Sequence, residues 1–213
     1  LVQLLQKTHT CITLDLPGFG STQSPTEAWG IHNYSEFVAE FIKKNNLNVA
    51  VVIGHSNGGT IAMYGLSHKI FSANKLVLLA SAGIRSDDKL KKTIYKVVAK
   101  TGRVLTKVLP ARTQQKLRSK LYKSAGSDIL VTPELEETFK KVVSYDIEAD
   151  AATITQPSLL LYASDDTATP SRYGLRLKNA IKDSRLHLLN SGGHFIHQTH
   201  TVEVADFIEE FTS

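Results

Sequence analysis

Apolar runs of strand length alternate along the chain with segments whose apolar residues recur at helical spacing. Asn48–Ile53, Lys75–Ala80 and Ser158–Ala163 are almost continuously apolar, which predicts strands buried on both faces. Helical spacing predicts four helices, over Tyr34–Asn45, Thr60–Ser67, Ser171–Ile181 and Val202–Phe211. The alternation predicts an α/β fold, with a mostly parallel sheet covered by helices on both faces.

Less regular segments extend this pattern toward both ends of the chain. Thr10–Asp15 and Leu186–Leu189 predict two further short strands, and Leu1–Lys7 looks like the end of a helix. Ser35 has a side chain suited to cap the helix that begins near Tyr34.

The pattern changes between Ser86 and Asp150, where only helical spacing is found. Thr132-Pro133-Glu134 has the capping threonine, the proline and the acidic residue that are typical of a helix start. We therefore expect residues 1–85 and 151–213 to form an α/β core, and residues 86–150 to form a helical cap inserted between two strands.

Composition fits one globular domain with a small insertion. Of the 213 residues, 42% are hydrophobic and 21% are charged. No apolar run approaches the ~18–20 residues of a membrane span, and no secretory signal is visible. Cys11 is the single cysteine, so an internal disulfide and a thiol-held zinc are both excluded. A cytoplasmic location is the default expectation.

The net charge of +5 is concentrated in one segment of the chain. Thirteen lysines and arginines and two aspartates lie between Arg85 and Lys123, a local net charge of +11. The simplest interpretation is a solvated helical face. A functional one is attraction of an anionic substrate or an anionic membrane surface. Nucleic acid is disfavoured, because no recognised binding motif accompanies the charge.

A serine nucleophile is indicated by Gly54-His55-Ser56-Asn57-Gly58, which matches G-x-S-x-G between a predicted strand and a predicted helix. In that setting the serine stands on a sharp turn, so the residues two before and two after it must lack bulk. The Asn57 amide points at the developing oxyanion, and the helix N-terminus adds positive potential there.

A serine hydroxyl needs a base, and the base needs an acid to orient it. His194 follows the last predicted strand in a glycine-rich loop, where it can overhang the carboxyl edge of the sheet. Asp165 and Asp166 follow the strand before it, and either carboxylate could accept the imidazole N–H. The other carboxylate would then cap or solvate its turn.

Histidines elsewhere have simpler interpretations. His194, His197 and His200 resemble a metal cluster, but their spacing of three and three is not the i, i+4 pair of zinc-protease helices. The remaining histidines, which are treated as surface or core residues, include His9, His32, His68 and His187. A dinucleotide-binding function is also disfavoured, because both glycine-rich turns lack part of G-x-G-x-x-G.

As a set, these motifs resemble the α/β-hydrolase superfamily, in its branch with a helical cap after the sixth strand. The likeness covers nearly the whole chain and is weakest in the cap. Asp15–Gly20 resembles the family's D-x-P-G-x-G, and Gly54–Gly59 its G-H-S-x-G-G elbow. Asp166–Pro170 resembles its D-x-x-x-P acid loop, and Gly193-His194-Phe195 its G-H-F base loop. The resemblance implies that Asp166 rather than Asp165 is the acid, that an acyl-enzyme forms on serine, and that no cofactor is needed.

The chain departs from the family pattern ahead of Thr10. The family has three strands there and a loop carrying H-G, which donates a second oxyanion N–H. Three strands and their connections imply that roughly 40 residues are absent. We therefore expect this sequence to be a fragment of a longer protein, with low activity and a tendency to aggregate through unpaired strand edges.

The sequence thus predicts a serine hydrolase in which Ser56, Asp166 and His194 are catalytic and Asn57 supplies an oxyanion N–H. The expected substrate is a small acyl compound, an ester before a peptide or a carbon–carbon bond, and the basic segment favours an anionic one. Neither a metal nor a cofactor is expected. The alternative is a non-catalytic binding protein of the same fold.

Overall fold

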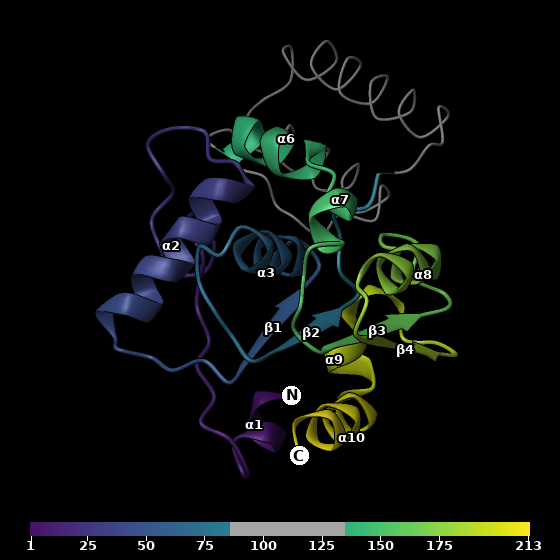
Figure 1. The fold of residues 1–213 in the computed structure, drawn as a ribbon. Coiled ribbons are helices and arrows are strands. Elements are labelled where there is room, and N and C mark those ends of the chain that lie inside the picture. Colours follow the sequence, from purple (N-terminus) through teal and green to yellow (C-terminus); the bar gives the residue numbers. More distant parts are fainter. Residues whose placement is uncertain (86–134) are drawn as a thin grey trace, which may run out of the picture. The chain divides into compact units, whose positions relative to one another are not determined.

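The computed structural model describes residues 1–85 and 135–213, and of these, residues 1–84 and 135–213 belong to one compact unit (Figure 1). Helices α6 (Glu136–Ser144) and α7 (Glu148–Ala151) lie in this unit, although all of their residues except Ala151 fall within the range expected to form the cap. Most of the expected cap, including the helix start at Thr132-Pro133-Glu134, lies outside the described residues.

Four parallel strands form the sheet. In spatial order they are β1 (Val51–His55), β2 (Lys75–Leu79), β3 (Ser158–Ala163) and β4 (Ser184–Leu189). Each pairs with its neighbour in parallel register, so all four carboxyl ends meet at one edge of the sheet. The predicted parallel sheet is therefore confirmed.

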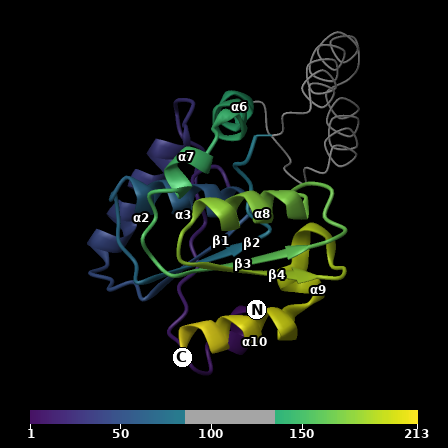
Figure 2. The same ribbon diagram turned by 45° about the vertical axis from the view of Figure 1, so that its right-hand side comes forward.

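Helices cover both faces of this sheet (Figure 2). One face is covered by α3 (Asn57–Ser67) and α8 (Ser171–Ala180), and α2 (Ile31–Lys44) packs against α3. The other face is covered by α10 (Thr201–Thr212), with α1 (Val2–Leu5) beside it. Two short helices, η2 (Gly193–Phe195) and α9 (Ile196–Thr199), connect β4 to α10.

The central strand β3 shows why a continuously apolar run is the correct pattern for a two-sided core. Leu160 and Tyr162 pack among residues of α3 and α8, whereas Leu159 and Leu161 pack against α10. Every residue of β3 is buried. A strand covered on both faces gains from apolar side chains at every position.

The strand predicted at Thr10–Asp15 does not form. The described residues place no strand beside this segment, and the side chain of Ile12 is 53% exposed. Extended backbone becomes a strand only when a neighbour accepts and donates its hydrogen bonds. The apolar residues of this segment were therefore insufficient to predict its structure.

The prediction for β1 was also partly wrong. The strand covers Val51–His55 rather than Asn48–Ile53, and Ile53 is 40% exposed. Within the described part of the chain, β1 pairs only with β2 and forms the edge of the sheet. An edge position explains why β1 is less buried than its composition predicted.

Ser35 is not a helix cap. Helix α2 begins at Ile31, and the Gly30 N–H donates to Asn33 Oδ1 at 2.9 Å. Ser35 lies one turn inside the helix, fully buried, and its hydroxyl donates to the Ile61 carbonyl of α3 at 3.1 Å. A buried hydroxyl needs such a partner, so Ser35 links two helices instead of starting one.

Candidate active site

Ser56 occupies the turn between β1 and α3. Its backbone angles are φ 51° and ψ −121°, an unfavourable conformation for a residue with a side chain. Three hydrogen bonds hold it: the Ser56 N–H donates to Leu79 O at 3.1 Å, and the Ser56 carbonyl accepts from Gly59 and Ala82 at 3.0 Å each. Helix α3 begins at Asn57, three residues before the predicted start, so the turn is tighter than expected.

Glycine is required on this turn, although not at both of the predicted positions. A Cβ on Gly54 would lie 2.5 Å from the Gly59 Cα, and a Cβ on Gly59 would overlap the Ser81 hydroxyl. A Cβ on Gly58, in contrast, would meet no described atom within 4 Å. The close approach is therefore made by Gly54 and Gly59, the first and third glycines of G-H-S-x-G-G. The prediction that the residue two after Ser56 must lack bulk was wrong, because Gly58 has room for a side chain.

Asp166 follows the end of β3 and has a fully buried side chain. Its Oδ1 accepts the N–H groups of Ala168 at 2.7 Å and of Thr169 at 2.9 Å, and the Thr169 hydroxyl lies 2.7 Å from its Oδ2. Burial alone would raise the pKa of Asp166. Hydrogen bonds from His194 and Thr169 outweigh burial and lower that pKa, so the carboxylate is ionised at neutral pH.

His194 lies in η2 after β4, between the other two side chains. Its Nδ1 is 2.9 Å from Asp166 Oδ2, and its Nε2 is 3.0 Å from the Ser56 Oγ. An ionised carboxylate accepts only, so Nδ1 carries the proton and the lone pair of Nε2 faces the serine. The structure thus brings together the three side chains that the motifs selected, at the carboxyl edge of the sheet.

Asn57 is the first residue of α3, so its backbone N–H has no acceptor within the helix. This N–H directly follows the serine at the positive end of the helix. Asn57 thus stands at the start of α3, three residues before the predicted helix start, and its role as an oxyanion donor stays a prediction.

Two further side chains contact the base loop, and sequence reasoning gave neither a role there. The Asp165 carboxylate accepts the N–H of Gly193 at 2.9 Å, so it binds the base loop rather than capping its own turn. The His55 Nε2 lies 2.8 Å from the His194 carbonyl oxygen and donates to it. His55 lies between the first glycine and the serine of the G-x-S-x-G motif, and its location inside the motif is the signal that could have drawn attention to it.

His55 is half-buried among other rings. Burial lowers the pKa of His55 to about 4, and the nearby His194 and His197 contribute in the same direction, against the hydrogen bond to the His194 carbonyl. The ring of His197 lies 4.5 Å from that of His55, and burial also lowers the pKa of His197. Both rings are therefore neutral at neutral pH.

The histidine triplet near the C-terminus does not converge. His197 packs beside His55, whereas His200 Nε2 lies 3.5 Å from the Ser191 hydroxyl and His194 faces Ser56. Among residues 1–85 and 135–213, no group of three or more His, Cys, Asp or Glu side chains is placed to hold a metal ion.

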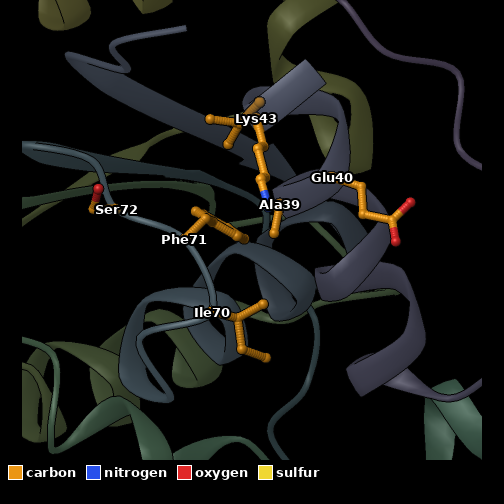
Figure 3. Close-up of a pocket in the computed structure, with 7 residues that line it drawn as sticks. Ala39, Glu40, Lys43, Ile70, Phe71 and Ser72 are labelled. Carbon is orange, nitrogen blue, oxygen red and sulfur yellow. The ribbon is translucent and has the colours of Figure 1, made fainter. Parts of the chain in front are cut away.

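A pocket of about 310 Å³ lies elsewhere, between α2 and the loop that follows α3 (Figure 3). Ala39 and Lys43 of α2 and Ile70 and Phe71 of the loop are among its lining residues. Ser56 precedes the first residue of α3, and the loop follows its last, so the 11-residue helix separates the two sites by about 16 Å. This pocket is therefore separate from the candidate active site.

Comparison with known proteins indicates the family of this chain. A family model described as the alpha/beta hydrolase fold matches residues 1–201. The chain belongs to the α/β-hydrolase family. This membership confirms the resemblance inferred from the four motifs and supports a hydrolase activity.

Individual relatives of this α/β hydrolase are distant. An uncharacterised hydrolase of Bacillus subtilis, YugF, is 24% identical, with 99% of this chain and 83% of the relative aligned. A meta-cleavage product hydrolase from Pseudomonas fluorescens superimposes with a TM-score of 0.69 at 18% identity, covering 99% of this chain and 82% of that one. An esterase from Exiguobacterium antarcticum gives 0.66 at 19% identity, covering 93% and 79%. At such identities the two structures support the fold alone.

The helices of the described residues include none that is both long and apolar enough to cross a membrane.

Proposed function

We propose that this α/β hydrolase cleaves an ester or a related acyl bond of a small molecule through an acyl-enzyme on Ser56. One observation carries the proposal: the unbroken series of contacts from Asp166 to His194 to Ser56, at 2.9 Å and 3.0 Å. Both lengths fall in the range for a base poised to take a proton and an acid that orients it.

In the first half of the reaction, His194 Nε2 removes the proton of the Ser56 hydroxyl while Oγ attacks the substrate carbonyl carbon. The electron pair of the carbonyl moves to its oxygen, and the Asn57 N–H donates to that oxyanion. Asp166 stabilises the imidazolium that has formed. His194 then gives its proton to the leaving oxygen, the ester bond breaks, and the acyl group remains on Ser56.

In the second half, water takes the place of the leaving alcohol. His194 removes a proton from the water, whose oxygen attacks the acyl carbon and forms a second tetrahedral intermediate. Collapse of that intermediate returns the proton to Ser56 Oγ and releases the carboxylic acid. All proton transfers pass through one nitrogen, so the reaction requires no cofactor.

Substrate preference is proposed from weaker observations. The solved structures that resemble this fold include an esterase and a meta-cleavage product hydrolase, so relatives point to more than one substrate. We place an ester first, because the series of contacts needs nothing further to hydrolyse one. Residues 86–150 would form the cap that shapes the pocket, and the +11 charge between Arg85 and Lys123 favours an anionic acyl compound.

Labelling with a fluorophosphonate probe tests the proposal directly. Wild-type protein is expected to be labelled and to hydrolyse p-nitrophenyl esters, whereas Ser56→Ala is expected to lose labelling and about a thousandfold or more of kcat. Ser67→Ala, at the other end of α3, is the matched control and should behave as wild type. Folded wild-type protein that neither reacts with the probe nor cleaves esters would refute the proposal, leaving a non-catalytic binding protein.

A further inference from the structure

The loop that carries His194 needs external support. Its two glycines, Gly192 and Gly193, have φ angles of 127° and 60°, in the region that residues with side chains rarely adopt. Glycine gains access to that region but loses more conformational entropy on folding than any other residue. Contacts from outside the loop must therefore select the conformation that directs His194 toward Ser56.

One such contact comes from the end of β1. His55 Nε2–H donates to the backbone carbonyl of His194 at 2.8 Å. The His55 ring is held in place by three others, with ring centroids at 4.5 Å from His197, 4.8 Å from His194 and 5.5 Å from Phe195. The donor is thus fixed by packing and is aimed at main chain rather than at a side chain.

A second contact comes from the end of β3. The Asp165 carboxylate accepts the Gly193 N–H at 2.9 Å through Oδ1, and the Gly192 N–H at 3.4 Å through Oδ2. These N–H groups belong to the residues with positive φ, just before His194. A charged acceptor makes this the stronger kind of hydrogen bond, although exposure to water weakens it.

Both contacts come from residues that directly precede a member of the proposed triad. His55 immediately precedes Ser56, and Asp165 immediately precedes Asp166. We propose that His55 and Asp165 are positioning residues that hold the main chain of the base loop in register with the nucleophile and the acid. The proposal deepens the proposed function and rests on it for the role of His194.

Both residues bond to main-chain atoms of the base loop rather than to the reacting atoms. His55 fixes the carbonyl on one side of His194 and Asp165 fixes the amide that precedes it, so the imidazole is presented at 2.9 Å from Asp166 and 3.0 Å from Ser56. A small displacement of the loop would lengthen both of these distances. Catalytic rates are sensitive to displacements of about 1 Å, whereas substrate affinity need not be.

Substitutions at His55 separate the donor from the ring. His55→Phe keeps an aromatic ring and removes the donor, and we expect kcat for p-nitrophenyl acetate to fall about tenfold with KM within about twofold. His55→Gln keeps a donor close to the position of Nε2 and is expected to recover most of the rate. The matched control is His187→Phe, the same exchange on β4, where His187 packs beside Phe207 of α10; this variant should leave kcat unchanged.

Asp165 provides an independent test, because its exposed side chain can be changed without disturbing the core. Asp165→Ala is expected to lower kcat about threefold to tenfold, and Asp165→Asn, which keeps one acceptor oxygen, to lose less. Fluorophosphonate labelling rates should fall in parallel for each variant. If His55→Phe fails to fold, the two Asp165 variants decide the proposal.

A spectroscopic signature distinguishes positioning from general stability. The Nδ1 proton of His194, held against Asp166, should give a strongly deshielded proton resonance in wild-type protein, and this signal should weaken in His55→Phe and return in His55→Gln.

Wild-type kcat and an unchanged signal in His55→Phe and Asp165→Ala would overturn the proposal. Equal impairment of His55→Gln and His55→Phe would also overturn it, because the ring alone would then matter. If wild-type protein is inactive, the proposed function fails, and the resonance still tests the positioning.

Discussion

At the scale of single residues, Thr169 stands out because its hydroxyl lies 2.7 Å from Asp166 Oδ2, 2.9 Å from the Ala80 carbonyl oxygen and 3.1 Å from His194 Nδ1. A hydroxyl has one hydrogen to donate, and an ionised carboxylate is the stronger acceptor. Thr169 therefore supports the same carboxylate oxygen that accepts the His194 N–H.

Thr169→Val removes this hydroxyl at nearly constant volume. We expect the pKa of Asp166 to rise, because a hydrogen bond that lowers it is lost, and the free energy of unfolding at neutral pH to fall by about 1–3 kcal/mol. Urea denaturation measures the change. Thr169→Ser, which keeps the hydroxyl, serves as control, and equal stability of Thr169→Val and wild type would contradict the assignment.

Some of the contacts at the candidate site could be predicted from the sequence, and others could not. Ser56, Asp166 and His194 were found because each stands in a local motif next to a predicted strand. Asp165 stands beside the acid-loop motif and Thr169 within it. Asp165 binds Gly193 of the base loop, however, and the Thr169 hydroxyl lies near the Ala80 carbonyl and His194 as well as Asp166. Hydrogen bonds between loops depend on tertiary distances that local sequence does not encode.

At the scale of elements, β1 differs from β3 in having a partner strand on only one side within the described part of the chain. Backbone groups on the open side of an edge strand depend on water or loops for their hydrogen bonds. Local opening of such a strand requires fewer contacts to be broken than opening of a central one.

Native-state hydrogen exchange should therefore distinguish the strands. Amides of Val51–Ile53 are expected to exchange faster than those of Leu159–Leu161, which are flanked by β2 and β4. Strand β2, with neighbours on both sides, is an internal control and should resemble β3. Equal protection of β1 and β3 would show that β1 has a further partner in solution.

Element prediction succeeded where burial is two-sided and failed where it depends on neighbours. The bounds of β3 were predicted to the residue, because every side chain of this strand is buried. The predictions of a strand at Thr10–Asp15 and of a fully buried β1 were wrong, because the presence of a partner strand is not a local property of the sequence. Helices α2 and α3 begin three residues earlier than predicted. Ile31 follows Gly30, whose backbone is extended, and Asn57 follows Ser56 on its strained turn, and neither Gly30 nor Ser56 provides a capping side chain.

At the scale of the whole molecule, the half-buried His55 links stability to pH. Its pKa is lowered by burial to about 4 in the folded protein, below the usual value near 6.5. As pH falls below about 6.5, the unfolded chain takes up a proton that folded His55 refuses, so the unfolded state is favoured. The contribution of His55 to stability is therefore fully present above pH about 6.5 and is lost as pH falls toward about 4.

We expect the free energy of unfolding of wild-type protein to fall between pH about 6.5 and about 4, with at most about 3 kcal/mol due to His55. His55→Gln removes this titrating group and should flatten the curve, while the lowered pKa of His197 leaves a residual slope. Urea denaturation at several pH values measures both. Parallel curves for wild type and His55→Gln would show that His55 ionises equally in both states.

The three side chains of the proposed triad come from the ends of three different strands, and Ser56 and His194 are 138 residues apart in the chain. Synthesis must therefore proceed past His194 before these groups can meet. Until β4 has docked, a growing or partly unfolded chain holds an ordinary, inert alcohol at Ser56. Reaction with a serine-directed probe would therefore count only molecules whose sheet is complete, and so would serve as a readout of folding as well as of chemistry.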